Sequence, residues 1–501
     1  MRRLLAIALC LLPLVAAAGC GGGGSSDNGK SPLDNALGYL PKSAPVVFVL
    51  DTDLNDGQWR SLTANVKKFP FAGQVESSLK SSIGDSGLSY DRDIKPLLGN
   101  ELVASAPTVQ ATVGSNSQAV AAMQVSDKGK LSNLLSHGKD LSKDGSSNGA
   151  TLYKANGGGT ELAQDADVLV IASTKQQAVA ALEQRGRDDR LTEDAFKGNL
   201  AGLPSHALIR GYVDARGLIN GSPGTQTARR VKWVAALRTV GFTLSSQSDG
   251  LAVDFDAKTD PSQLSDSDLP IASGDASPPV ATPAGEIGVG IRGLDQAERF
   301  AERVAQVVSR ASYSSFVRSK RQLSSQLGVN VDKDLVGQLS GNASFAFDLA
   351  GHFAMRAEPK DPAAFGRTLV RFARVAPQFA QGAGLHGAKL TRAGGLYKLT
   401  DRNGKTTYYG MVGKVFGLSD SAARLAQIAS TSPQAVPGAK GALAINADIG
   451  KLVSQIIAQA AGGGLGGAFG GSLITAPLGS LTGWASSSTS GISGHLKLQI
   501  K

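Results

Sequence analysis

The sequence predicts an α+β protein with two homologous tandem halves, each an antiparallel sheet with helices packed on one face. Three observations lead to this prediction. Collinear sequence blocks occur twice, at a spacing close to 242 residues. Several segments alternate apolar and polar residues with a period of two, as strands with one buried face do. Strand-like runs are separated by helix-like segments without regular β–α–β alternation, which favours antiparallel pairing.

The first 19 residues have the pattern of a signal peptide. Arg2 and Arg3 precede an apolar run over residues 4–18, which is shorter than the ~20 residues that a membrane-spanning helix needs. The run ends in Ala17-Ala18-Gly19-Cys20, which resembles the lipobox of bacterial lipoproteins. By this resemblance Cys20 becomes the first mature residue and carries a thioether-linked diacylglycerol, with palmitate as a typical acyl chain. A secreted protein with a chance cysteine near its cleavage site is the alternative.

Residues 20–36 begin with glycines and serines and form a predicted tether. About a dozen such residues reach ~20 Å, enough to clear a lipid headgroup layer. Two or three acyl chains anchor a protein stably, whereas one chain does so only marginally. We therefore expect an extracytoplasmic protein, lipid-anchored to the bacterial cell membrane.

Cysteine content and charge exclude several classes of function. The chain has two cysteines: Cys10 lies in the predicted signal peptide, and Cys20 is the predicted lipidation site. The mature chain then has no thiol for a disulfide, a metal or a nucleophile. The net charge of +10 suits an anionic lipid or envelope polymer. No nucleic acid is expected as a partner, because no RNP, helix-turn-helix or zinc-finger pattern is present.

The two halves are predicted to cover residues 37–258 and 283–501. Val47 and Val289 lie 242 residues apart in matching segments, as do Asn100 and Asn342, and Phe242 and Trp484. An acidic D-x-D motif recurs at a spacing of 241 residues, one less than the spacing of Asn100 and Asn342. We therefore expect the second half to have one inserted residue between this motif and its asparagine. Residues 259–282 are rich in Pro, Ser and Asp and are expected to be a linker.

Local patterns place elements within each half. Apolar spacing predicts helices that begin near Trp59 and near Phe365, and a helix over 175–184 is expected after a serine cap. Asn403-Gly404 predicts the turn of a β-hairpin.

One family resemblance accompanies these elements. The segments LPKSAPVVFVLDTDL and DRDIKPLLGNELVAS, with the lipoprotein-like start, resemble a family of bacterial lipoproteins catalogued as domain of unknown function 3352. The resemblance implies export and lipidation. It implies no activity and no catalytic residue.

We predict no catalytic residue, metal site or cofactor from the motifs. The D-x-D motif contains Asp91 and Asp93 in the first half and Asp332 and Asp334 in the second. Paired carboxylates suit acid–base catalysis or calcium binding, but Asp93 and Asp334 precede short apolar runs, and we favour helix capping. The sequence contains no HExxH pattern, and its five histidines are dispersed.

Two surfaces remain as candidates for contact with a partner. Arg367, Arg371 and Arg374 follow i, i+4, i+7 spacing on one helix face, which suits an anionic surface or an ordinary solvated face. The glycine-rich stretch near the C-terminus has apolar residues that predict a contact loop, with a passive connector as the alternative. These apolar residues are Leu465, Phe469, Leu473 and Ile474.

Three classes of function are consistent with the sequence. The first is a non-catalytic envelope lipoprotein with a binding or scaffolding role, held at the membrane through lipidated Cys20. The second is a carrier or binder of a lipid or other apolar envelope molecule. The third and least favoured is an envelope hydrolase.

Overall fold

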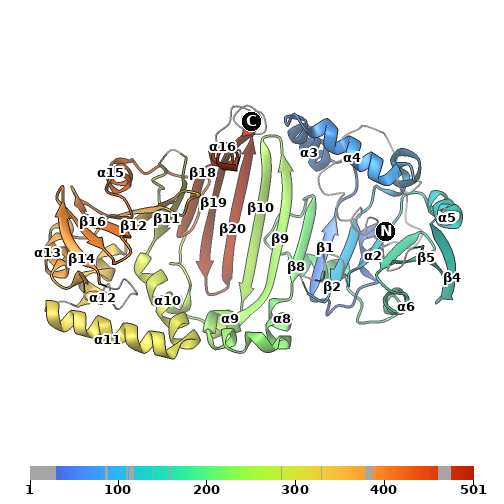
Figure 1. The fold of residues 1–501 in the computed structure, drawn as a ribbon. Coiled ribbons are helices and arrows are strands. Elements are labelled where there is room, and N and C mark those ends of the chain that lie inside the picture. Colours follow the sequence, from blue (N-terminus) through green and yellow to red (C-terminus); the bar gives the residue numbers. More distant parts are fainter. Residues whose placement is uncertain are drawn as a thin grey trace. The chain divides into compact units, whose positions relative to one another are not determined.

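The chain divides into two compact units in the computed structural model (Figure 1). Unit 1 comprises Met1–Gly221, Arg238–Asp256 and Ile500–Lys501, and unit 2 comprises Ser222–Leu237 and Ala257–Gln499. The structure describes residues 30–84, 88–108, 111, 118–138, 140–156, 160–283, 285–328, 330–377, 387–460 and 475–501.

Unit 1 alternates short helices with strands. In chain order its elements are α2 (Pro32–Leu37), β1 (Val46–Leu50), α3 (Gly57–Lys67), α4 (Ala72–Gly84), η1 (Tyr90–Ile94), η2 (Lys95–Leu97), β2 (Leu102–Ala106), β3 (Val120–Gln124), α5 (Lys128–His137), β4 (Leu141–Ser147), β5 (Ala150–Ala155), β6 (Glu161–Asp165), β7 (Val168–Ala172), α6 (Lys175–Gln184), α7 (Glu193–Asn199), β8 (Ile209–Val213), α8 (Ala215–Gly221), β9 (Leu237–Gln247) and β10 (Gly250–Thr259). Its strands pair in the order β10-β9-β8-β1-β2-β3-β7-β6-β5-β4.

Unit 2 begins with short helical segments and continues with a second series of strands. Its elements are η4 (Pro223–Thr225), η5 (Ala228–Arg230), α9 (Lys232–Ala236), η6 (Pro261–Gln263), η7 (Asp266–Asp268), β11 (Ile287–Arg292), α10 (Leu294–Val308), α11 (Arg310–Leu327), α12 (Val331–Asp334), η8 (Val336–Leu339), β12 (Asn342–Phe347), β13 (Phe353–Ala357), α13 (Pro362–Ala373), β14 (Lys389–Ala393), β15 (Leu396–Thr400), β16 (Thr406–Val412), β17 (Val415–Ser419), α15 (Ala422–Ser430), β18 (Leu443–Asp448), α16 (Ile449–Ala460), β19 (Leu478–Ser488) and β20 (Gly491–Ile500).

The strands of unit 2 pair in the order β20-β19-β18-β11-β12-β13-β17-β16-β15-β14, which is the order of unit 1 with ten added to each strand number. All the strand pairs whose registers are resolved within the units are antiparallel. The predicted α+β class with antiparallel sheets is therefore confirmed, while a common origin of the two halves stays a prediction.

The register of the two sheets corrects the predicted offset between the halves. Phe48 pairs with Ala104 of β2, and Val289 pairs with Phe345 of β12. Val289 lies 241 residues after Phe48, and Phe345 lies 241 residues after Ala104, whereas the sequence predicted a spacing of 242. A slip of one residue turns a strand residue to the opposite sheet face, so the counterpart of Val289 is Phe48 and not Val47.

The offset of 241 returns at the strand after next. Phe48 pairs with Gly211, which pairs with Phe242, and in unit 2 Val289 pairs with Ile445, which pairs with Gly483. Gly211 and Ile445 lie 234 residues apart, whereas Phe242 and Gly483 lie 241 apart. The counterpart of Phe242 is therefore Gly483 rather than Trp484. Asn100 and Asn342 are likewise one position out of register, and no inserted residue is needed between the D-x-D motif and the following strand.

Helices cover both faces of each sheet, whereas the sequence predicted one covered face. In unit 1, α2, α6 and α7 pack on the face that carries Val47 and Val49, and α3 and α5 pack on the other. In unit 2, α10 and α13 cover one face and α15 covers the other. The reason lies in central strands such as VVFVL and VLVIA, whose unbroken apolar runs require burial on both sides.

Residues 259–282, expected to be a linker, pack as part of unit 2. Leu269, Val280 and Ala281 are fully buried. The backbone of Val280 exchanges two hydrogen bonds of 2.8 Å with Gln434. Gly288 and Gly290 of β11 leave the space that this segment fills, because a Cβ at either position would meet Val280 or its neighbours at 3.0 Å or less.

Local predictions of helices and turns agree well with the structure. Helix α6 spans Lys175–Gln184 as predicted, although its cap is Thr174 rather than the serine before it. The hairpin of β15 and β16 turns at Asn403-Gly404, where Gly404 has a φ of +79°. In the described part of the chain, no helix has the length and apolar character needed to cross a membrane.

Candidate binding surface

Several predicted site residues lie outside the described part of the chain. These residues are Cys20, the predicted lipidation site, and Leu465, Phe469, Leu473 and Ile474, the predicted contact loop. Both assignments stay predictions from the sequence.

The D-x-D motif closes one helical turn in each unit. Ser89 and Asn330 are the N-cap residues, and each side chain accepts a hydrogen bond from the backbone N–H three positions later. Asp93 and Asp334 fold back and accept the backbone N–H of these caps at 2.8 Å. The N-caps are therefore Ser89 and Asn330 rather than the predicted Asp93 and Asp334. These two aspartates complete the capping box from within the turn.

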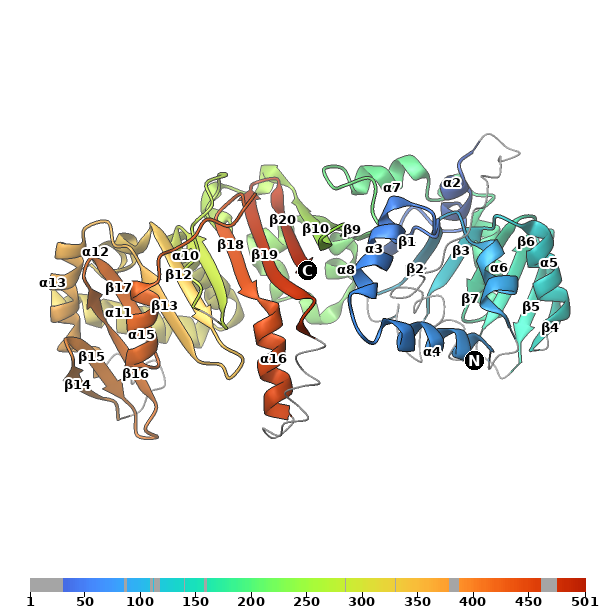
Figure 2. The same cartoon turned by 90° about the horizontal axis from the view of Figure 1, so that it is seen from above.

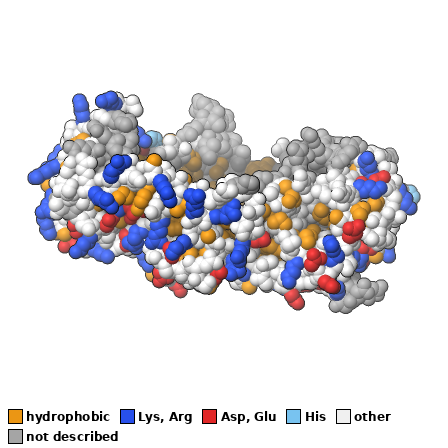
Figure 3. Space-filling view, turned by 90° about the horizontal axis from the view of Figure 1, so that it is seen from below, with side chains coloured by type: hydrophobic (Ala, Val, Ile, Leu, Met, Phe, Trp, Pro, Cys, Tyr) orange, Lys and Arg blue, Asp and Glu red, His pale blue; other side chains and the backbone are white. Residues whose placement is uncertain are grey.

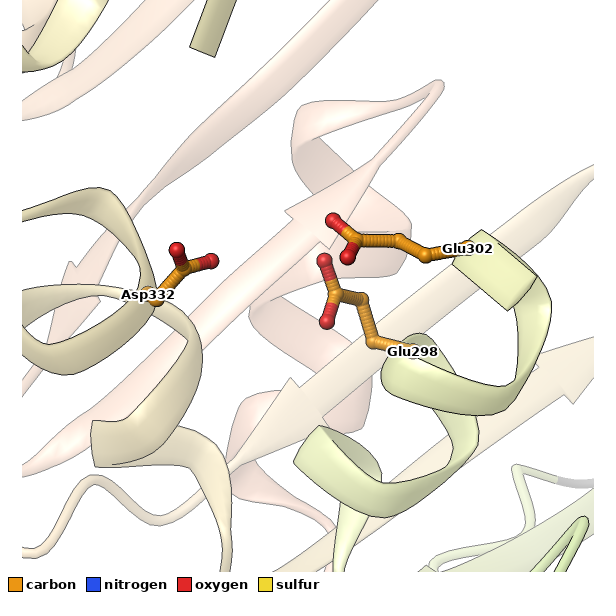
Figure 4. Close-up of side chains that lie close together, drawn as sticks. All are labelled: Glu298, Glu302 and Asp332. Atoms are coloured by element: carbon orange, nitrogen blue, oxygen red, sulfur yellow. The ribbon is translucent and has the colours of Figure 1, made fainter. Parts of the chain in front are cut away.

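The described residues contain one group of three carboxylates close enough to share a metal ion (Figure 4). Glu298 and Glu302 project from successive turns of α10 toward Asp332 of α12, and one oxygen of each lies within 4.8 Å of the others. This arrangement was not predicted from the sequence, because it brings together two segments 30 residues apart.

Lys320 of α11 occupies the position that a cation would take among these carboxylates. Its Nζ lies 3.3 Å from Glu298 Oε1 and 2.5 Å from Glu302 Oε1, and it also contacts Asp332. Burial lowers the pKa of Lys320, but its bonds to Asp332 and Glu302 outweigh this effect and hold the pKa above its usual range. The ammonium group stays charged, so the cluster is an internal ion-pair network that joins α10, α11 and α12.

Asp51, directly after the last residue of β1 in unit 1, is a second carboxylate in an unusual environment. The pKa of Asp51 is raised to about 6, mainly by burial and also by the nearby charges of Asp56 and Glu101, against the lowering effect of one backbone N–H from Asp53. A carboxyl group with a raised pKa in the folded state binds its proton more tightly there than in the unfolded chain.

We expect Asp51→Asn to stabilise unit 1 at pH 7.5 by about 1–2 kcal/mol, after solvent screening of this half-buried group. The unfolded chain ionises Asp51 near pH 4 and the folded one near pH 6, so the wild type loses stability as pH rises through this window. Melting temperatures at pH 7.5 and pH 4 test this, because the gain should vanish at pH 4. An equal gain at both values contradicts it.

Positive charge is concentrated in the segment from α13 to β17, residues 362–419, which we call the basic module. It contains nine Lys and Arg against one acidic residue, Asp401. The corresponding segment of unit 1, from α5 to β7, has five basic and five acidic residues. The two units thus share strand order but differ sharply in charge here.

Helix α13 carries the predicted basic stripe on its solvent side. Its apolar side packs on β16 and β17: the ring of Phe365 lies 5.2 Å from that of Phe416, and Phe372 lies 5.9 Å from Tyr409. Arg367, Arg371 and Arg374 are exposed. The structure therefore brings the three arginines onto one accessible face, as their spacing predicts.

The basic module contains one acidic residue, Asp401, and its carboxylate does not pair with the exposed arginines and lysines that the structure describes. Asp401 is used locally, since its Oδ1 accepts the backbone N–H groups of Asn403 and Lys405 at 2.9 and 2.8 Å. Among the described residues, no acidic side chain forms an ion pair with the exposed basic side chains of the module. Lys and Arg side chains are frequent at the α13 end of unit 2 in a space-filling view (Figure 3). The exposed basic set is Arg367, Arg371, Arg374, Lys389, Arg392, Arg402, Lys405 and Lys414.

No curated protein matches the sequence at a significant level. Solved structures with partial likeness include crystal forms of TP0453. Form III is 9% identical, with a TM-score of 0.27 over 45% of this chain and 79% of that chain. Form I is 12% identical, with a TM-score of 0.26 over 44% and 78%. A family model described as "Protein of unknown function (DUF3352)" matches residues 4–379, and the chain therefore belongs to this family.

Proposed function

We propose that this chain is a lipid-anchored extracytoplasmic protein of the bacterial envelope that acts by binding or scaffolding rather than by catalysis. The observation that carries the proposal is the order of the first 31 residues: two arginines, a short apolar run, Ala17-Ala18-Gly19-Cys20 and a Gly/Ser-rich tether. Two or three acyl chains on Cys20 would hold the chain at the membrane. The tether gives the units, which begin at α2, room to reach the surroundings of the membrane.

The distribution of charged groups supports a binding role. The acidic cluster on α10 and α12 is occupied by Lys320. The exposed arginines of α13, in contrast, lack acidic partners in the described part of the chain and are free to meet an anionic envelope component. The proposed partner is therefore anionic, and the proposed contact is electrostatic.

Metabolic labelling with radioactive palmitate in a bacterial host tests the anchor. We expect the wild-type chain to incorporate label and Cys20→Ala to incorporate none, because the thioether can form only at this sulfur. Cys10→Ala is the matched control and should label like the wild type. Equal labelling of wild type and Cys20→Ala would refute the anchor.

A further inference from the structure

We propose that the basic module docks the protein onto the surface of an anionic lipid bilayer, with the solvent side of α13 as the contact face. This inference rests on the proposed function for the nearness of the bilayer, but the docking itself uses no acyl chain. It therefore applies equally to a chain that lacks Cys20.

The first support is the asymmetry between the units. The chain carries a net charge of +10, and the basic module alone, with nine basic residues and Asp401, contributes +8 of it. Its counterpart in unit 1 is neutral although its strands pair in the same order. The fold therefore does not require these charges, which are a property added to unit 2.

The second support is the composition of the α13 face. Val370 lies between Arg367 and Arg374 at i+3 and i+4 spacing, and 48% of its side chain is exposed. Helices that lie in a membrane interface combine basic side chains with exposed apolar ones in this way. Lys389 and Arg392 on the edge strand β14 have a second explanation, because charges on edge strands prevent aggregation. The stripe on α13 does not lie on an edge strand, so protection against aggregation does not account for it.

The third support is the layout of the module. Its basic side chains come from α13, from the edge strand β14 and from the turns at Arg402 and Lys414, which are the turns at the two ends of β16. Helix α13 and strand β14 both lie at one end of unit 2 (Figure 2). Charges distributed over a helix and several turns match a surface of many anionic headgroups better than one small anion. Each arginine near such a surface strengthens binding by about fivefold.

Co-flotation with vesicles tests the docking. The protein is the chain that starts at Gly21, which lacks the apolar run and Cys20 but keeps every described element. We expect it to float with phosphatidylcholine vesicles that contain phosphatidylglycerol at low ionic strength. It should not float with pure phosphatidylcholine, and high salt should release it. The triple variant Arg367→Gln, Arg371→Gln, Arg374→Gln should bind about 100-fold more weakly.

The matched control removes three exposed charges from the counterpart segment of unit 1, by Lys128→Gln, Lys130→Gln and Lys154→Gln. It should bind within about twofold of the wild type. Equal weakening of both triple variants would overturn the proposal, since net charge alone would then explain binding. Flotation that fails while polyphosphate still binds would also overturn it and assign the stripe to a soluble polyanion. Neither result would affect palmitate labelling at Cys20, so the two proposals fail separately.

Discussion

Replacing Lys320 by methionine should lower the stability of unit 2 by about 2–4 kcal/mol at pH 7. Methionine keeps most of the aliphatic stem but removes the charge that Glu298, Glu302 and Asp332 share. Only 12% of the Lys320 side chain is exposed, so water screens the remaining carboxylates poorly. Their mutual repulsion is then uncompensated, except at Asp332, which is mostly exposed.

The pH dependence gives this prediction its control. Burial and the neighbouring Glu302 raise the pKa of Glu298 even in the wild type, and without Lys320 it should rise further. Protonation at pH 4 then relieves the repulsion, so the difference between wild type and variant should shrink as pH falls. Thermal unfolding at pH 7 and pH 4 measures this. Lys80→Met, which breaks an exposed pair with Glu76, should cost less than about 0.5 kcal/mol.

The variant Lys320→Ala extends the same experiment. It leaves three carboxylates around an open space, a ligand set that suits Ca²⁺. Millimolar CaCl₂ should therefore raise the melting temperature of this variant and leave that of the wild type unchanged. A calcium effect on the wild type instead would contradict the assignment of the cluster to Lys320.

Phe365→Ala should destabilise unit 2 by about 3–5 kcal/mol. The Phe365 side chain is 2% exposed and fills the core between α13 and the sheet, where it touches Phe416 and lies among the residues that hold the helix in place. Its removal leaves a cavity between α13 and the sheet, on the side of the helix opposite the arginine stripe. Urea unfolding followed by circular dichroism should show a lower midpoint.

Val370→Ala on the same helix is the comparison for this variant. Its side chain is half exposed, so we expect a change below about 0.5 kcal/mol. If both substitutions cost the same, α13 is not held to the sheet by its buried face.

Patterns local in sequence predicted most of the elements. The i, i+4, i+7 spacing placed Arg367, Arg371 and Arg374 on one face because helix geometry alone determines it. Asn403-Gly404 predicted the hairpin turn for a similar reason, since few residue pairs adopt its backbone. The cap of α6 was misplaced by one residue, because a serine and a threonine stand side by side and either can cap.

Features that depend on contacts distant in sequence were beyond this kind of prediction. Matching apolar residues in β1 and β11 gave an offset of 242, since the valines of VVFVL look alike on both faces, and only pairing with neighbouring strands shows 241. The composition of residues 259–282 suggests a linker, yet Leu269 and Val280 fit spaces formed by other segments. The network of Lys320 was missed because its four members come from three helices.

The division of the chain into units has a consequence for how the protein is made. Unit 1 takes residues up to 221, then 238–256, and finally 500–501, while unit 2 takes the intervening residues. A ribosome therefore releases neither unit as one uninterrupted stretch. Unit 1 lacks β9 and β10 until synthesis has passed through the first segment of unit 2, and unit 2 lacks β19 and β20 until synthesis is almost complete. All ten strands of unit 1 nevertheless precede the first strand of unit 2, which begins at Ile287, so the sheet of unit 1 has all its strands while that of unit 2 is still being made.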